Sequence, residues 1–159
     1  MFILFMTLRN ESVAAVVSFY NRQLNFECRG KFLCQLGYDS VMYSELLLDH
    51  FRNPRNAGKL ANASAEVTAT NPICGDILEL AVRVSNGEIA EARFLCRGCT
   101  TSIACASFLT ERLTGCSLLV ARSITAETVS QALGGLPSAT FHGAQLAEDA
   151  LRLLLAKLV

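Results

Sequence analysis

Apolar and polar residues alternate along two segments near the middle of the chain, residues 77–84 (ILELAVRV) and 89–96 (IAEARFLC). Such alternation is typical of β-strands that bury one face. Asn86 and Gly87 separate the two segments, and this dipeptide favours a tight hairpin turn. A third short strand is expected at 66–70, so the pattern predicts a small antiparallel sheet of three strands.

Apolar residues at helical spacing flank this predicted sheet. We expect four helices, over residues 44–52, about 100–114, from 125 or 126 to about 133, and over about 143–157. The last helix shows a polar stripe made of Gln145, Glu148, Asp149 and Arg152. One helix, a β-meander and then several helices predict an α+β fold, in which a small antiparallel three-stranded sheet has helices packed on one face.

The composition excludes several classes of partner. The chain has 159 residues, of which 52% are apolar, so it can bury a real core. Lys plus Arg and Asp plus Glu both number 14, which gives no basic surface for nucleic acid. The apolar start, MFILFMTLRN, is too short to span a membrane and lacks the pattern of a signal peptide. We therefore expect a cytoplasmic protein that binds neither nucleic acid nor membrane.

The first 41 residues differ in pattern from the rest of the chain. Cys28 and Cys34 have no further ligand types at metal spacing around them. We expect residues 1–41 to be an N-terminal extension that is poorly ordered or stems from a mis-assigned start, and 42–159 to form the folded domain.

Three short stretches carry the candidate ligands: Cys74 and Asp76 in NPICGD, Cys99 in RGCTTS, and His142 in TFHGAQ. A hairpin returns the chain to its starting end, so the loops around 74–76 and 96–99 are expected at the same edge of the sheet. His142 is expected just before the last helix. Convergence of these residues would form a site, whereas the alternative is a set of scattered buried cysteines and a solvated aspartate.

The residue types fit metal chemistry. Cys99 opens a predicted helix, where the unpaired N–H groups and the helix dipole favour the thiolate. Gly75 and Gly98 lie next to Cys74 and Cys99 and allow sharp turns. Two cysteines, an aspartate and a histidine complete a tetrahedral site for iron or zinc.

The other cysteines of this region support fewer roles. Cys96 and Cys99 form a C-x-x-C pair. A redox role of the thioredoxin type would require a βαβ unit beside the pair, which an antiparallel meander lacks. Cys105 lies nearly two helical turns beyond Cys99, beside the apolar stripe, and is expected to pack in the core. Cys116, at the far end of that helix, is not expected to be a ligand.

Four motifs together resemble the IscU/NifU-type iron–sulfur cluster scaffold proteins (the NifU N-terminal domain family) over about residues 42–158. They are MYSELLLDHFRNPRNAGKL, NPICGD, RFLCRGCTTSIACASFLTE and FHGAQLAEDAL. The resemblance implies a non-enzymatic scaffold that receives sulfur from a cysteine desulfurase, builds a [2Fe–2S] cluster and passes it to apo-proteins. It implies that Cys74 and Cys99 are ligands, that Asp76 keeps the cluster transferable, and that His142 is a further ligand.

Two positions depart from the family pattern. The family has a third ligand cysteine directly after the histidine, where this chain has Gly143, so standard sulfur acceptance is in doubt. Cys96 is the best candidate for a replacement thiolate, although a cysteine at a strand end can equally point into the core. The segment that in the family docks an Hsp70-type chaperone reads LPSAT (136–140) and lacks the lysine, which makes this partner doubtful.

The departures leave a second hypothesis open. In it the chain is a divergent paralogue that binds zinc and partners or regulates a cysteine desulfurase without building clusters. A thiol-based enzyme rests only on the C-x-x-C pair and has the least support.

Overall fold

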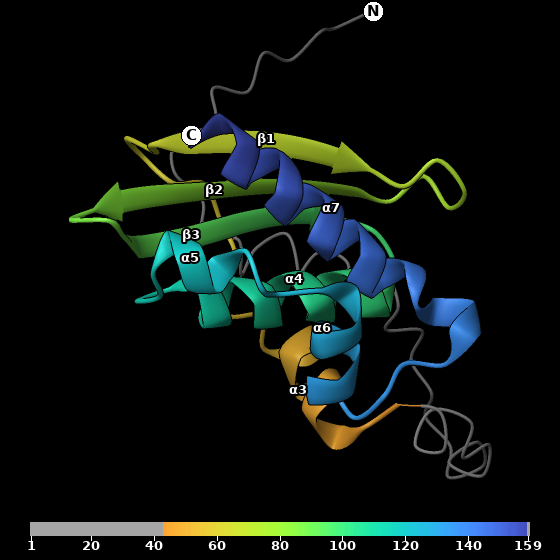
Figure 1. The fold of residues 1–159 in the computed structure, drawn as a ribbon. Helices are drawn as coiled ribbons and strands as arrows, with labels where there is room; N and C mark the ends of the chain where they lie inside the picture. The colour runs from red at the N-terminus through yellow and green to blue at the C-terminus, as the bar shows by residue number, and fades with distance from the viewer. Residues whose placement is uncertain (1–42, 159) are drawn as a thin grey trace, which may run out of the picture. The chain divides into compact units, whose positions relative to one another are not determined.

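The computed structural model describes residues 43–158, which hold three strands and a set of helices (Figure 1). The strands are β1 (Ala65–Thr70), β2 (Ile77–Ser85) and β3 (Glu88–Arg97). They pair antiparallel in the order β1-β2-β3, as predicted. Asn86 and Gly87 connect β2 to β3 with φ angles of 53° and 81°, the left-handed conformation that a tight hairpin turn requires.

The predicted helices are confirmed, with small differences at their ends. The helical elements are α3 (Glu45–Arg52), α4 (Thr100–Leu113), α5 (Leu118–Ala121), α6 (Ala126–Ala132), the 3₁₀ turn η1 (Ser138–Thr140) and α7 (His142–Lys157). The short α5 was not predicted, because four residues are too few to show a helical period. No helix among the described residues is long and apolar enough to cross a membrane.

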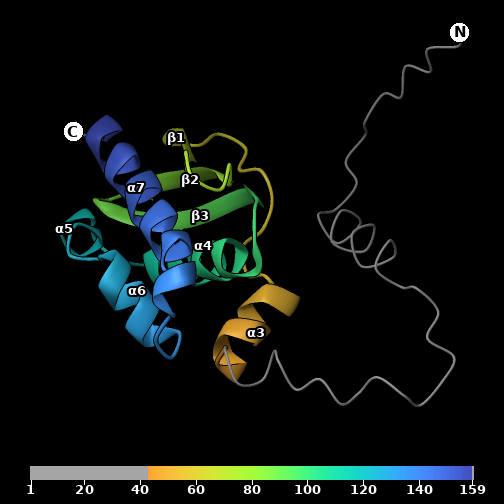
Figure 2. The same ribbon diagram turned by 90° about the vertical axis from the view of Figure 1, so that its right-hand side faces the viewer.

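The helices form layers on one face of the sheet. α4 packs on β3, and α7 packs on β1 and β2 and also on α4. In both views α3 and α6 lie beyond α4, away from the sheet (Figures 1 and 2). The core between these layers is apolar and made largely of Val67, Leu78, Leu80, Val82, Ile89, Phe94, Leu109, Leu113, Leu151 and Leu154. The predicted arrangement, an antiparallel sheet with helices on one face, is confirmed.

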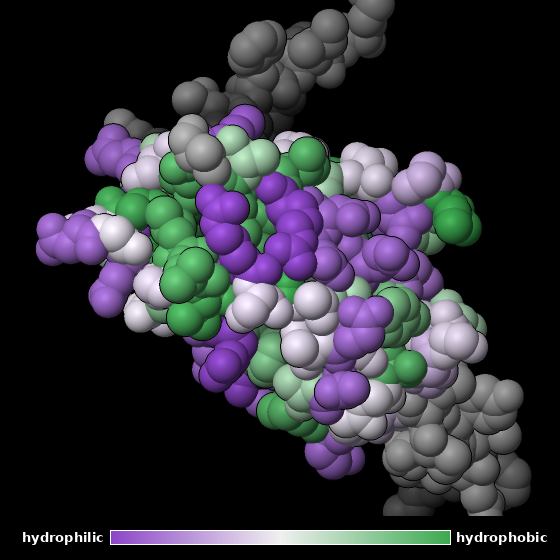
Figure 3. Space-filling model, viewed as in Figure 1, coloured by the Kyte–Doolittle hydropathy of each residue, from purple (hydrophilic) through white to green (hydrophobic). Residues whose placement is uncertain are grey.

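α7 is amphipathic as its sequence indicates. Its buried residues include Leu146, Leu151 and Leu154, while Gln145 and Asp149 are exposed. Figure 3 shows the resulting hydrophilic surface over α7, next to hydrophobic surface over α5. One face of α7 therefore lies in the core and the other in solvent. Its first residues lie at the edge of the sheet and belong to the candidate site.

A buried polar network fixes α3 and the connector after it to α4. The hydroxyl of Ser107 accepts a hydrogen bond from the backbone N–H of Arg55 (2.8 Å) and lies 2.9 Å from Nδ1 of His50. His50 is only 2% exposed, and its Nε2 lies 3.6 Å from the Glu111 carboxylate. Burial lowers the pKa of His50, more than the nearby carboxylates raise it. The ring is therefore held neutral between two helices.

Residues 1–41, including Cys28 and Cys34, lie outside the described residues, so the predictions made for them are not tested by the structure. The proposed division of the chain at residue 42 therefore stays a prediction.

Candidate metal-binding site

Strand register brings two of the candidate loops together. Ile77, the first residue of β2, pairs with Arg97, the last residue of β3. The loop that carries Cys74 and Asp76 is therefore next to the turn that leads into Cys99, at the same edge of the sheet, as predicted. α7 begins at His142 and packs on α4, so it adds a third segment to this edge.

The loop before β2 is closed by hydrogen bonds of its own backbone. Asn71 donates its N–H to the carbonyl of Asp76 (2.9 Å) and accepts at its own carbonyl from Gly75 N–H (2.9 Å). Gly75 has a φ of 73°, where a residue with a side chain would be strained. The loop thus leaves Cys74 exposed to solvent, beside Ile73, whose side chain is 91% exposed.

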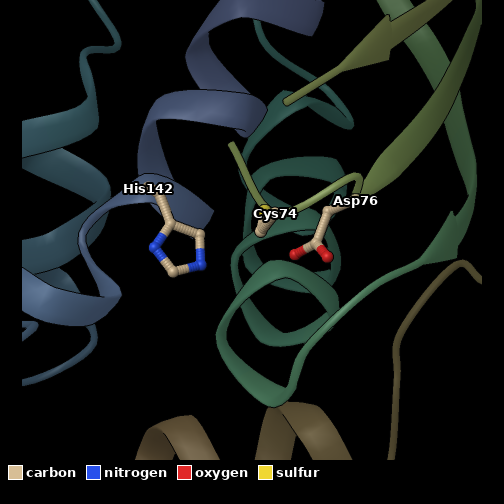
Figure 4. Close-up of side chains that lie close together, drawn as sticks. All are labelled: Cys74, Asp76 and His142. Carbon is tan, nitrogen blue, oxygen red and sulfur yellow. The ribbon is translucent and has the colours of Figure 1, made fainter. Parts of the chain in front are cut away.

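Three of the four predicted ligands converge in the structure, and the fourth, Cys99, contacts one of them. The ligand atoms of Cys74, Asp76 and His142 all lie within 4.8 Å of one another, and Figure 4 shows the three side chains facing a common space. The sulfur of Cys99 lies 3.7 Å from Nε2 of His142. A metal ion with bonds of about 2.0–2.3 Å holds its donor atoms roughly 3.5 Å apart, so small side-chain movements would suffice to bind one.

Asp76 is the buried member of this group, at 7% exposure. Its Oδ2 accepts hydrogen bonds from Ser102 Oγ (2.5 Å) and from the Cys99 backbone N–H (3.2 Å). Burial on its own would raise the pKa of Asp76, but these hydrogen bonds, together with weaker ones from the Cys99 and Cys74 side chains, outweigh burial and hold the pKa below its usual value. The carboxylate is therefore ionised and available as an oxygen ligand at neutral pH.

Gly98 has a different role from the one expected. Its backbone does not take up a positive φ, in contrast to Gly75. A Cβ placed on Gly98 would lie 2.7 Å from Cγ of Asp76, closer than atoms pack. Glycine at this position thus gives room for the Asp76 carboxylate to reach the Cys99 backbone.

Two hydroxyl groups that the sequence analysis did not single out lie beside Cys99. Cys99 is the N-cap residue of α4, and its side chain makes no capping hydrogen bond. Its sulfur instead lies 3.0 Å from Thr101 Oγ1 and 3.3 Å from Ser102 Oγ. The run of hydroxyl residues directly after Cys99 was a signal for these contacts, but only the packing shows where each hydroxyl points.

Gly143, at the position of the missing cysteine, is buried in a close helix contact. A Cβ on this residue would lie 2.9 Å from the backbone N of Ser102, from the backbone C of Thr101 and from Thr101 Oγ1. The first turn of α7 therefore lies directly on the first turn of α4. The site has no room for a further side chain at 143 unless one of the two helices shifts.

Cys96 lies outside the group of converging ligand atoms. It pairs with Leu78 in the sheet and packs against the hydrophobic core. Burial, together with the negative charges of nearby Asp76, Cys99 and Cys74, raises the pKa of Cys96 to about 12. Its thiol is therefore protonated at neutral pH, which does not favour a ligand role.

The two cysteines that follow Cys99 in the sequence, Cys105 and Cys116, are also outside the ligand group. Cys105 is fully buried, as predicted, and burial raises its pKa to about 12. Cys116 follows the end of α4 and packs against the core, and burial raises its pKa as well. Neither thiol is placed to bind a metal ion together with Cys74.

Comparison with known proteins places this arrangement in a family. The family described as NifU-like N terminal domain matches residues 42–158. IscU 1 of Archaeoglobus fulgidus, an iron–sulfur cluster assembly scaffold protein, is 42% identical over 111 residues, which cover 70% of this chain and 72% of that protein. The scaffold protein IscU of Escherichia coli is 38% identical over 120 residues, which cover 73% of this chain and 93% of that protein.

A solved structure agrees at the level of the fold. The crystal structure of a SufU protein from Fervidobacterium islandicum has a TM-score of 0.59 with this chain and 21% identity, and the match covers 72% of this chain and 97% of that one. This likeness concerns the fold alone. The family match over 42–158 and the IscU relatives confirm the resemblance seen in the motifs: the chain belongs to the NifU-like N-terminal domain family.

Proposed function

We propose that this protein is a scaffold on which an iron–sulfur cluster is assembled and from which the cluster passes to apo-proteins. The observation that carries the proposal is the convergence of Cys74, Asp76 and His142 within 4.8 Å, with the Cys99 sulfur 3.7 Å from His142. Thiolates are the usual protein ligands of iron–sulfur clusters, and imidazole can replace some of them. The IscU relatives carry the name of such scaffolds.

The ligand set suits a cluster that is cargo. Only two of the four groups are thiols, and Cys74 and Cys99 are both exposed to solvent. Fewer thiolates and greater exposure make a cluster easier to release than one held by four buried cysteines. Asp76 adds a hard oxygen ligand that binds iron in a cluster less firmly than sulfur does. The protein is thus proposed to be a carrier and not an enzyme.

The proposed partners follow from the same site. A cysteine desulfurase would deliver sulfur, and apo iron–sulfur proteins would receive the cluster, both at the edge where Cys74 and Ile73 are exposed. An Hsp70-type chaperone is not proposed, because LPSAT lacks the lysine of the family's docking segment. The reduced thiols that a cluster needs fit a cytoplasmic location.

Anaerobic reconstitution of the full chain with ferric iron and sulfide tests the proposal. The wild type should develop the visible charge-transfer bands of a cluster, and Cys74→Ser and Cys99→Ser should lose most of them. Cys116→Ser is the matched control, since this thiol lies at the other end of α4. A wild type without bands, or a Cys116→Ser loss as large as that of Cys99→Ser, would count against the scaffold.

Cys96→Ala in the same experiment decides the role of that cysteine. Because the Cys96 thiol is half-buried against the core and its pKa is raised to about 12, we expect the cluster yield to stay at the wild-type level. A clear loss of yield would instead assign Cys96 as the replacement thiolate.

The packing at Gly143 favours a second candidate function. A side chain there would require one of the two helices to shift, so as packed the site offers two sulfurs, one nitrogen and one oxygen, the donor number of a tetrahedral zinc site. A zinc protein of this kind would partner or regulate a cysteine desulfurase without building clusters. One tightly bound zinc per chain after purification, together with no bands on reconstitution, would favour this function over the scaffold.

A further inference from the structure

We propose that Thr101 and Ser102 are positioning residues of the metal-binding site. Thr101 directs its hydroxyl at the Cys99 sulfur, and Ser102 fixes the Asp76 carboxylate. The inference rests on the proposed function in one respect, namely that a metal ion or cluster binds at Cys74, Asp76, Cys99 and His142. It assigns roles to two side chains that are not themselves ligands.

Ser102 is built into the site as a buried donor. The residue is 1% exposed, and its hydroxyl donates to Oδ2 of Asp76 at 2.5 Å. The Cys99 backbone N–H donates to the same oxygen at 3.2 Å. Two donors on Oδ2 set the plane of the carboxylate, and Figure 4 shows one carboxylate oxygen on the side that faces His142. Ser102 therefore orients Asp76 before a metal ion arrives.

Thr101 performs the corresponding task for Cys99. It is also 1% exposed, and its Oγ1 lies 3.0 Å from the Cys99 sulfur. When Cys99 binds a metal ion its sulfur carries no proton, so the hydroxyl of Thr101 must be the donor. A hydrogen bond to a ligating sulfur withdraws electron density from it and weakens its bond to the metal.

Gly143 packs against the Thr101 hydroxyl and the backbone of Ser102. Its α-carbon lies so close to α4 that a Cβ would be 2.9 Å from Thr101 Oγ1 and 2.9 Å from the backbone N of Ser102. The first turn of α7 thus covers Thr101 and excludes water from its hydroxyl. The same contact places His142, the preceding residue, with Nε2 3.7 Å from the Cys99 sulfur.

Cobalt(II) binding to the full chain tests the proposal, because cobalt reports on its ligands through visible absorption. Ser102→Ala should weaken cobalt binding by about tenfold, as is usual when a hydrogen-bond partner of a metal ligand is removed. Thr101→Val should move the sulfur-to-cobalt charge-transfer band to longer wavelength, since a sulfur without its donor holds its electrons less tightly. Thr101→Ser keeps the hydroxyl and should restore the wild-type band.

Ser107→Ala is the matched control. Ser107 is a fully buried serine of the same helix with two hydrogen-bonding neighbours, His50 and the Arg55 backbone, and it lies away from the ligands. Its loss should lower thermal stability and leave the cobalt affinity and spectrum unchanged. A cobalt affinity of Ser107→Ala as low as that of Ser102→Ala would show a purely structural effect and overturn the proposal.

The positioning roles and the proposed function give different results in this experiment. A wild type that binds cobalt, with Ser102→Ala and Thr101→Val matching it in affinity and spectrum, overturns the positioning roles and leaves the proposed function standing. A wild type that binds no cobalt contradicts the proposed function and the positioning roles with it.

Discussion

Gly143 lies where the first turn of α7 meets the first turn of α4, at the residue that follows His142. Its packing limits the sulfur content of the site, because a side chain there would overlap the backbone of Thr101 and Ser102. At the position where the family has a cysteine, this chain has direct contact between α7 and α4 instead.

Gly143→Cys should consequently destabilise the protein by about 1–3 kcal/mol, the usual cost of forcing extra volume into a packed region. Urea unfolding measures this, with Ala139→Cys, which adds a thiol at an exposed position of the neighbouring turn, as the control. An unchanged free energy of unfolding for Gly143→Cys would show that the two helices separate easily.

His50 gives the fold a dependence on pH. Burial keeps the pKa of His50 below its usual value of 6.5, so the unfolded chain takes up a proton at higher pH than the folded chain does. The contribution of His50 to stability is complete above pH 6.5 and is lost as the pH falls toward the lower pKa of the folded state. The loss amounts to at most about 1.4 kcal/mol for each pH unit.

Urea unfolding at pH 7.5 and pH 5.5 measures this effect. The wild type should lose stability between the two values, and His50→Gln should lose less, because glutamine does not titrate. Equal losses in both proteins would show that other groups cause the pH dependence.

Single residues also show what the sequence can and cannot reveal. The hairpin predicted that Cys74, Asp76 and Cys99 would lie at one edge of the sheet, whereas His142 was assigned to the same site through the family resemblance. The contacts of Thr101 and Ser102 were not predictable, since hydroxyl residues at a helix start are commonplace and only the close approach of α7 gives them partners.

At the scale of elements, α3 is fixed at its start to the end of α6. Ser44 caps α3 by accepting from the Leu47 N–H (3.1 Å), and its hydroxyl donates to the carbonyl of Leu133. Gly134 leaves room for this approach, because a Cβ there would lie 2.6 Å from Cβ of Ser44. One side chain thus serves the ends of two helices.

Ser44→Ala should therefore lower the free energy of unfolding by about 1–3 kcal/mol, since it removes a helix cap and a further hydrogen bond. Ser117→Ala is the matched control, because Ser117 caps only the four-residue α5 through the Val120 N–H. Its cost should be smaller, and thermal or urea unfolding compares the two. A cost of Ser44→Ala no larger than that of Ser117→Ala would contradict the linking role.

The elements themselves were largely predictable from sequence. Alternation marked β2 and β3, Asn86 and Gly87 marked the hairpin between them, and Thr125 marked the start of α6, where it forms a capping box with Thr128. The layering of α3 and α6 beyond α4 depends on contacts distant in sequence, such as Ser44 with Leu133, which no local pattern contains.

At the scale of the whole molecule, the described domain gathers its chemistry at one edge of the sheet. The strands bring Cys74, Asp76 and Cys99 to that edge, and α7 returns from the other end of the sequence to add His142. At this edge Cys74 is exposed to solvent, whereas Gly143 is buried between α4 and α7. This is the arrangement expected of a protein that must exchange its cargo with other proteins.

Cluster transfer tests the proposed function most directly. The full chain, loaded anaerobically with iron and sulfide and separated from free ions, is mixed with an apo-ferredoxin, and the ferredoxin's circular dichroism is followed with an iron chelator present. A scaffold should convert the ferredoxin to its cluster-bound form faster than free iron and sulfide do, with the chelator having little effect. No transfer, or transfer that the chelator abolishes, would contradict the proposal that this site assembles and delivers a cluster.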